Sequence, residues 1–252
     1  MKKRKKGWLF LILMIFLAAA GAVGYQVYLE VKKTPDEIVE IENQKTETAY
    51  KENLEQALNA RRKYDFIVVL NPAHGGVDAG HESAFGTEKE IVLAICNKVI
   101  AANADAKVGI FVTRSQDVGM DQDMRSSFVE QMQPDLFIDV HVNKSTNAGT
   151  YGTSVSYDTT YFNRKLSNVE LADIMEKSVV SAIEGFAVGI IDVTDKEEGA
   201  LLKGLTMPAV RIACGDMSNE TEGELLTRDS YQSNLAGGIL DGIYAARKKL
   251  EE

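Results

Sequence analysis

The feature that most constrains the fold is a regular alternation of short apolar runs and helical patterns from residue 66 onward. The apolar runs lie at residues 66–72, 107–114, 135–142, 152–157, 187–193 and 208–214. Amphipathic helical patterns lie at residues 88–102, 122–132, 163–184 and 229–249. Short uninterrupted apolar runs are typical of strands buried on both faces. The alternation predicts a single α/β domain with a mostly parallel, twisted sheet of about six strands and helices on both faces.

Residues 1–29 differ from the rest of the chain. A basic stretch, MKKRKK, precedes an apolar run from Trp8 to about Val23 that carries no charge. The run is slightly shorter than the ~20 residues of a full membrane span, and its small residues Ala18–Ala22 also allow cleavage as a signal peptide. We predict an uncleaved, single-pass transmembrane helix. The basic flank is then cytoplasmic and the remaining chain lies outside the cytoplasm.

Residues 30–64 are rich in Glu and Lys, with charges at helical spacing. This composition predicts a solvated helical stalk or linker, followed by the globular domain at residues 65–252. The formal net charge of −9 argues against a nucleic-acid partner, because phosphates would repel the chain.

A candidate metal site follows from the positions of the histidines. The chain has three histidines, and two of them, His74 and His141, stand where predicted strands end. Glu88 opens the first predicted helix of the domain. Ligands gather outside the carboxyl ends of strands in open α/β sheets, and two imidazoles with a carboxylate form a common zinc set. Spacing alone leaves open that these are packed core or rim residues. His81 is expected to be a surface loop residue.

Several motifs, in order, resemble one family. The stretch VVLNPAHGGVDAGHESAFGTEKEIVLAI is similar to the opening of the zinc-dependent N-acetylmuramoyl-L-alanine amidases called Amidase_3. That opening reads strand, Pro-Gly-His-Gly-Gly, Asp-x-Gly and then Glu-Lys at a helix start. VTRSQD, RSSFVEQMQPDLFIDVHVN and MPAVRIACGDMSNETE resemble the later family motifs, the last of which reads Met-Pro-Ala-Val-Leu-Val-Glu-x-Gly.

The resemblance implies a function and a ligand set. It implies that His74, Glu88 and His141 bind one Zn²⁺. It also implies that the substrate is peptidoglycan, cleaved at the amide between N-acetylmuramic acid and L-alanine. In the family a water activated by the metal attacks the carbonyl, and a glutamate on the last strand is the general base. Ala213 occupies that glutamate position.

Other departures from the family pattern suggest replacements for the missing base. Asp139 stands where the family commonly has Ser, and Asp216 where it has an aromatic residue. Asp139 lies two positions before His141 on one strand, so both side chains face the same way. We name Asp139 and Asp216 as candidate substitute bases. Asp139 is also a candidate to orient an imidazole.

Three functions remain open from the sequence. The first is a working or weakened peptidoglycan amidase that uses Asp139, Asp216 or the metal alone. The second is an inactive pseudo-amidase that binds peptidoglycan or regulates a hydrolase. The third is a structural or sensory domain without zinc.

Overall fold

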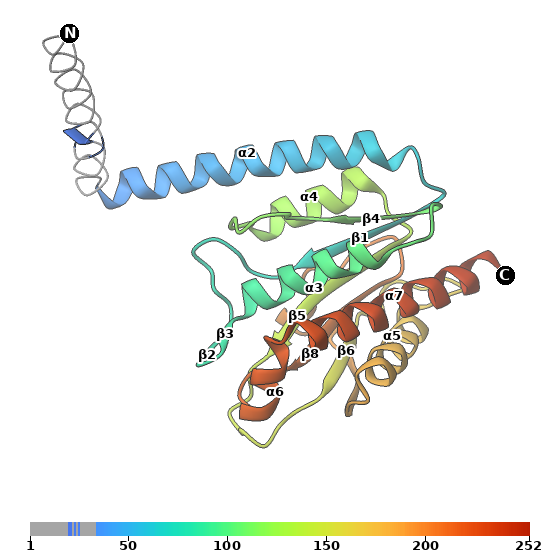
Figure 1. The fold of residues 1–252 in the computed structure, drawn as a ribbon. Coiled ribbons are helices and arrows are strands. Elements are labelled where there is room, and N and C mark those ends of the chain that lie inside the picture. The colour runs from blue at the N-terminus through green and yellow to red at the C-terminus, as the bar shows by residue number, and fades with distance from the viewer. Residues whose placement is uncertain (1–19, 22, 24, 26–33) are drawn as a thin grey trace, which may run out of the picture. The chain divides into compact units, whose positions relative to one another are not determined.

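The computed structural model describes residues 20, 21, 23, 25 and 34–252 (Figure 1). The chain forms two compact units, Met1–Gln44 and Lys45–Glu252. The predicted transmembrane helix lies largely outside the described residues. Where the chain is described, no helix has both the length and the apolar composition needed to cross a membrane.

The second unit contains a six-stranded sheet in the order β4-β1-β5-β8-β6-β7. All neighbouring strands are parallel except β6 and β8, which are antiparallel. The strands are β1 (Phe66–Pro72), β4 (Val108–Val112), β5 (Leu136–Asn143), β6 (Thr153–Tyr157), β7 (Ala187–Asp192) and β8 (Ala209–Asp216). The predicted single α/β domain with a mostly parallel sheet is confirmed.

One face of the sheet is covered by α3 (Glu88–Ala102), α5 (Asn168–Ile183) and α7 (Asp229–Glu251), as Figure 1 shows. Their apolar sides and those of the strands form the larger hydrophobic core. The start of α5 is set by a capping box, in which Ser167 and Glu170 satisfy each other's backbone amides. Cys96 and Cys214 are buried on this face as free thiols.

The opposite face packs against α4 (Gln122–Met132) and the C-terminal part of α2 (Pro35–Arg61). Leu54 and Ala57 of α2 are buried there. Asn53 donates hydrogen bonds to two backbone carbonyls at the end of β4, at 2.8 and 2.9 Å. The compact unit begins at Lys45, and apolar residues of α2 complete the second core. The domain boundary at residue 65 stays a prediction.

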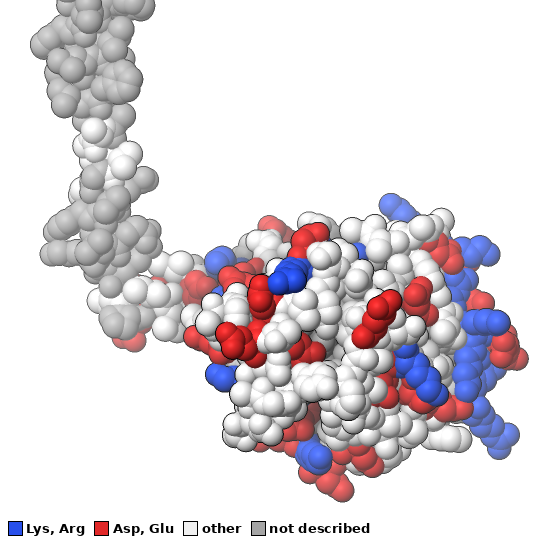
Figure 2. Space-filling model, turned by 60° about the horizontal axis from the view of Figure 1, so that its bottom comes forward, with Lys and Arg blue, Asp and Glu red and all other residues white. Residues whose placement is uncertain are grey.

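Short elements connect these layers. They are the hairpin strands β2 (Glu82–Ser83) and β3 (Gly86–Thr87), the 3-10 helix η1 (Glu197–Gly199) and α6 (Glu220–Leu226). Figure 2 shows acidic side chains spread over the visible face of the domain, as the net charge of −9 leads one to expect.

The second face of the sheet changes character along the strands. At the amino ends it carries the apolar residues Ile67, Val69 and Phe137. Towards the carboxyl ends it carries Asn71, which pairs in register with Asp139 of β5. This change places polar side chains at one edge of the sheet, next to an apolar core that holds the strands in position.

Candidate metal centre

Three side chains from separate segments converge at the carboxyl ends of β1 and β5. His74 follows β1, His141 lies near the end of β5, and Glu88 is the first residue of α3. One ligand atom from each residue lies within 4.8 Å of the others. The two imidazole rings have centroids 5.6 Å apart. The structure thus brings together the three residues that the sequence nominated as ligands.

Glu88 is the centre of this cluster and is fully buried. Its Oε1 lies 3.0 Å from His141 Nδ1, and its Oε2 lies 3.1 Å from His74 Nε2. Backbone N–H groups of Val142 and His81 also donate to it, at 3.0 and 3.1 Å. Burial alone would raise the pKa of Glu88, but the neighbouring imidazoles of His141 and His74 hold this pKa well below its ordinary value. The carboxylate is therefore ionised, as a metal ligand must be.

Each of the two histidines has a carboxylate on its other ring nitrogen. Asp78 Oδ2 lies 2.7 Å from His74 Nδ1, and Asp139 Oδ2 lies 3.0 Å from His141 Nε2. A carboxylate accepts the proton of the distal nitrogen and leaves the near nitrogen with a free lone pair. This arrangement accompanies most histidines that bind metals.

Asp139 lies behind His141, away from Glu88. Its second oxygen accepts a hydrogen bond of 2.6 Å from Asn71 Nδ2, and the side chain is buried. Burial by itself would raise the pKa of Asp139, but attraction and hydrogen bonding from His141 lower it to about 2. Both carboxylate oxygens are engaged, which suits Asp139 to orienting His141 better than to moving protons.

The loop that carries His74 is held in an uncommon backbone conformation. His74 itself has a φ of 57°, and a non-glycine residue in this region is often found at functional sites. Arg114 and Arg125 donate to backbone carbonyls of this loop at 2.8–3.0 Å. At Gly80, where φ is +67°, an added Cβ would lie 2.5 Å from the His74 ring and 2.8 Å from Glu88 Oε2. Glycine is required there for His74 and Glu88 to meet.

His81 belongs to the cluster, contrary to the expectation of a surface loop residue. Its Nδ1 lies 2.7 Å from Glu88 Oε2, although its side chain remains 41% exposed. The ring contacts Glu88 on the same oxygen that faces His74. The sequence indicated the proximity of His81 to the cluster only through the short loop that it shares with His74. The contact of its ring with Glu88 depends on the tertiary structure.

The β8 side of the cluster carries no carboxylate at the position that the family motif assigns. Ala213 pairs in register with His141, and Arg211 pairs with Asp139. Ala213 is buried beside His141. Arg211 reaches along the sheet so that its Nη2 lies 3.1 Å from His141 Nδ1, while its Nη1 donates to the Glu198 carbonyl at 3.0 Å. Arg211 has no distinguishing pattern in the sequence, because its partner His141 lies on another strand.

Asp216, the other candidate base, is buried and bound elsewhere. Its carboxylate accepts hydrogen bonds from the backbone and hydroxyl groups of Ser145 and Ser218. These bonds fasten the end of β8 to the loop after β5. Asp216 does not line the cavity beside the cluster. The structure therefore offers no support for Asp216 as a base.

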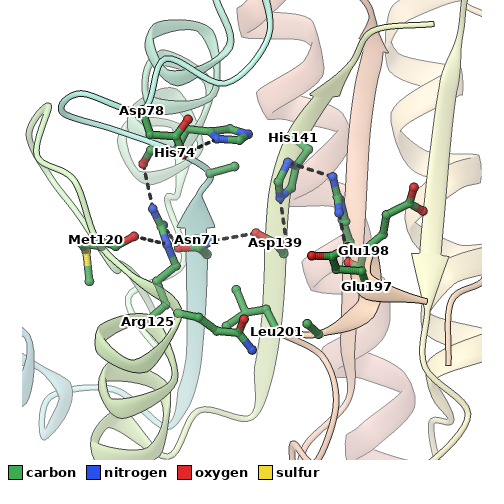
Figure 3. Close-up of a pocket in the computed structure, with 14 residues that line it drawn as sticks. Asn71, His74, Asp78, Met120, Arg125, Asp139, His141, Glu197, Glu198 and Leu201 are labelled. Atoms are coloured by element: carbon green, nitrogen blue, oxygen red, sulfur yellow. Dashed lines mark hydrogen bonds and ion pairs between the residues drawn. The ribbon is translucent and has the colours of Figure 1, made fainter. Parts of the chain in front are cut away.

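A cavity of about 230 Å³ opens next to the cluster. Figure 3 shows His74 and Asp78 on one wall, His141 and Asp139 in the middle, and Glu197 and Glu198 of η1 on the other wall. Arg211 also lines it. The cavity is therefore bordered by two of the nominated ligands and by charged groups of both signs.

The donor set suits a divalent cation. With the distal nitrogens bound to Asp78 and Asp139, the near nitrogens of His74 and His141 direct lone pairs at Glu88. Lone pairs facing a carboxylate at 3.0–3.1 Å repel it unless a proton or a cation lies between them. Two imidazoles and a carboxylate are ligands that zinc prefers. His74, Glu88 and His141 thus fit zinc.

Together, the mostly parallel sheet and this donor set define an α/β domain with a candidate metal site at the carboxyl ends of its strands. The chain belongs to the N-acetylmuramoyl-L-alanine amidase family, Amidase_3, whose model matches residues 68–245. The similarity predicted from the motifs is therefore confirmed.

Known proteins agree with this assignment. The endolysin of Bacillus phage SPP1 is 28% identical over 179 residues, which cover 70% of this chain and 64% of the endolysin. AmiC, an N-acetylmuramoyl-L-alanine amidase of Escherichia coli O6:H1, is 22% identical, and the match covers 74% of this chain and 54% of AmiC. The chain thus spans less than two thirds of either relative.

Solved structures show the same fold. The catalytic domain of CwlV, an N-acetylmuramoyl-L-alanine amidase from Bacillus (Paenibacillus) polymyxa var. colistinus, superposes with a TM-score of 0.64 at 27% identity. The match covers 73% of this chain and 98% of that domain. An N-acetylmuramoyl-L-alanine amidase from Clostridium difficile 630 gives a TM-score of 0.65 at 25% identity.

Proposed function

We propose that this chain is a zinc-dependent peptidoglycan amidase of reduced activity, acting on the amide between N-acetylmuramic acid and L-alanine. The observation that carries the proposal is the convergence of His74, Glu88 and His141 within 4.8 Å beside an open cavity. Zinc, when bound there, would supply Lewis-acid polarisation of the scissile carbonyl.

The chain's own residues account for the rest of the proposed chemistry. Asp78 and Asp139 hold the two imidazoles with their near nitrogens facing Glu88. Arg125 donates to the His74 carbonyl at 2.8 Å and keeps the loop in place. In this proposal the cavity beside them would receive the part of the substrate next to the scissile amide.

Reduced activity follows from Ala213. A positioned general base contributes about 10²–10⁴-fold to the rate, and an alanine transfers no proton. Asp139 and Asp216 are both committed to other hydrogen bonds. Hydrolysis would then depend on the metal site without a dedicated proton acceptor on β8.

The test is turnover of a defined muropeptide by the full-length chain, purified with zinc in a mild detergent. We expect slow release of the peptide that stops when His74 is changed to Ala. Slow release that persists in His74→Ala would show that the cluster does not carry the activity. The absence of any release by the native chain, with release by Ala213→Glu, would favour the second candidate.

The second candidate is a pseudo-amidase that binds peptidoglycan without cleaving it, and Ala213 is the observation that favours it. This function predicts saturable sedimentation of the chain with purified sacculi. It also predicts no new free amino groups in the sacculi after prolonged incubation. Detection of such groups with the native chain, and not with His74→Ala, would refute it.

We propose an extracytoplasmic location for the domain, on the basis of the basic flank and apolar run before residue 30. Peptidoglycan as substrate requires this location. Protease added to intact protoplasts should digest residues 65–252 and spare an N-terminal tag. Protection of the domain would contradict both the location and the substrate.

A further inference from the structure

The near nitrogen of His141 has two competing neighbours. Nδ1 lies 3.0 Å from Glu88 Oε1 and 3.1 Å from Arg211 Nη2. A guanidinium only donates hydrogen bonds and an ionised carboxylate only accepts them. A single ring nitrogen either donates or accepts, so one of these two contacts is unsatisfied in the absence of a metal.

The distal nitrogen decides which contact is satisfied. Nε2 of His141 lies 3.0 Å from Asp139 Oδ2, which accepts the ring proton. In the neutral ring, Nδ1 then carries a lone pair, and the Arg211 N–H can donate to it. This lone pair is also the one that a metal bound by His141 and Glu88 would require.

We propose that Arg211 competes with the metal for the lone pair of His141 Nδ1 and thereby lowers the zinc affinity of this site. The inference rests on the proposed function, because it presupposes that the cluster binds zinc. It concerns a residue that the family motif does not assign to metal binding, since Arg211 stands where the motif has Leu.

The position of Arg211 makes the competition direct. The β5–β8 register sets Arg211 opposite Asp139, so its side chain runs beside the ring of His141. Its Nη1 is anchored on the carbonyl of Glu198 in η1, at 3.0 Å. This anchor holds Nη2 against the ring instead of leaving it free in solvent.

The charge of Arg211 adds to the effect. Within residues 34–252 its guanidinium forms no ion pair at 4.0 Å or less, and its attraction to the Asp139 carboxylate opposite it on β5 acts over a longer distance. A cation beside a second cation at short range is unfavourable in a partly buried site. Binding of zinc therefore requires Nη2 to give up His141 and the guanidinium to move into the cavity that it lines.

The experiment compares zinc dissociation constants of full-length variants by competition with a chromophoric chelator. Arg211→Met retains an unbranched apolar stem, which is shorter than that of arginine, and removes the charge and the donors. We expect it to bind zinc about tenfold more tightly than the native chain, a change similar in size and opposite in direction to the loss seen when a group that supports a metal ligand is removed. Arg211→Lys retains the charge without the planar fork and should give an intermediate affinity.

Arg228→Met is the matched control. It removes the same charge from a residue that pairs with Glu224 on the surface at 2.7 Å, outside the cavity. Its zinc affinity should equal that of the native chain. Melting temperatures measured in chelator establish that each variant is folded, and Arg211→Gln replaces Arg211→Met if the latter unfolds.

Two results would overturn the inference, and they differ in meaning. In the first result, the native chain binds zinc and His74→Ala does not, but folded Arg211→Met binds zinc no more tightly than the native chain. This result refutes only the proposed competition by Arg211. Absence of zinc binding in the native chain and in all Arg211 variants refutes the metal site, and the proposed function fails with it.

Discussion

The two sides of His141 differ in how many of their polar side chains are paired through hydrogen bonds or ion pairs. On the side of β1 and α3, both carboxylate oxygens of Glu88 face an imidazole, and each imidazole has a carboxylate behind it. On the side of β8, the position opposite His141 is Ala213, and the neighbouring polar group is the guanidinium of Arg211. The three candidate ligands and the position that the family motif gives to the base thus lie on different segments, so the first set can be complete while the base is missing.

The largest effect is expected from removing the central ligand. Glu88→Gln should reduce bound zinc from about one ion per chain to well below half, because the amide is neutral and cannot replace the carboxylate. Zinc should also cease to raise the melting temperature, since a ligand stabilises only the state that binds it. Metal analysis and thermal melting measure both quantities.

Glu90→Gln is the control for this change, because Glu90 is exposed in the same helix turn. If Glu88→Gln retains its zinc, then His74, Glu88 and His141 do not form the metal site.

The next effect concerns the β8 side. Ala213→Glu places a carboxylate opposite His141 and should raise the hydrolysis rate of a muropeptide by about 10²–10⁴-fold. Ala213→Gln has the same size and transfers no proton, so it should leave the rate unchanged. The rates are measured by chromatography of the released peptide. Equal rates for the Glu and Gln variants would mean that the missing group on β8 is not a proton acceptor.

A smaller effect separates the two candidate bases. Asp139→Asn should weaken zinc binding by roughly 10–100-fold, because the amide no longer fixes the ring proton of His141 on Nε2. Asp216→Asn should leave zinc affinity unchanged, because its carboxylate contacts Ser145 and Ser218 instead. Similar zinc affinities of the two variants in chelator competition would contradict the position assigned to Asp139.

The smallest effect tests how the loop is held. Gly80→Ala should lower the free energy of unfolding by about 1–3 kcal/mol and weaken zinc binding, since its Cβ would press on the His74 ring. Gly204→Ala is the matched control, with a φ of +79° and no atom within 4 Å of the added Cβ. It should cost only the backbone strain, about 1 kcal/mol. Urea titration of both variants would refute the expectation if Gly204→Ala proved equally or more destabilising.

The sequence by itself determined the elements of this protein and the nominated metal ligands. Strand and helix periods depend on neighbouring residues, so the stretch from Phe66 to Pro72 and the helix that starts at Glu88 were predictable without the fold. The motifs around His74 and His141 carried the family assignment, and the resemblance aligned Ala213 with the glutamate of the family motif.

Only the tertiary structure decided what surrounds those ligands. It placed β8 next to β5, turned His81 back to Glu88, packed α2 against the second core from Lys45 onward and brought Arg211 within 3.1 Å of His141. The physical reason is that hydrogen bonds and ion pairs form between side chains that are close in space. His141 and Arg211 are 70 positions apart along the chain. The sequence contains no periodic pattern from which a contact over such a separation could be predicted.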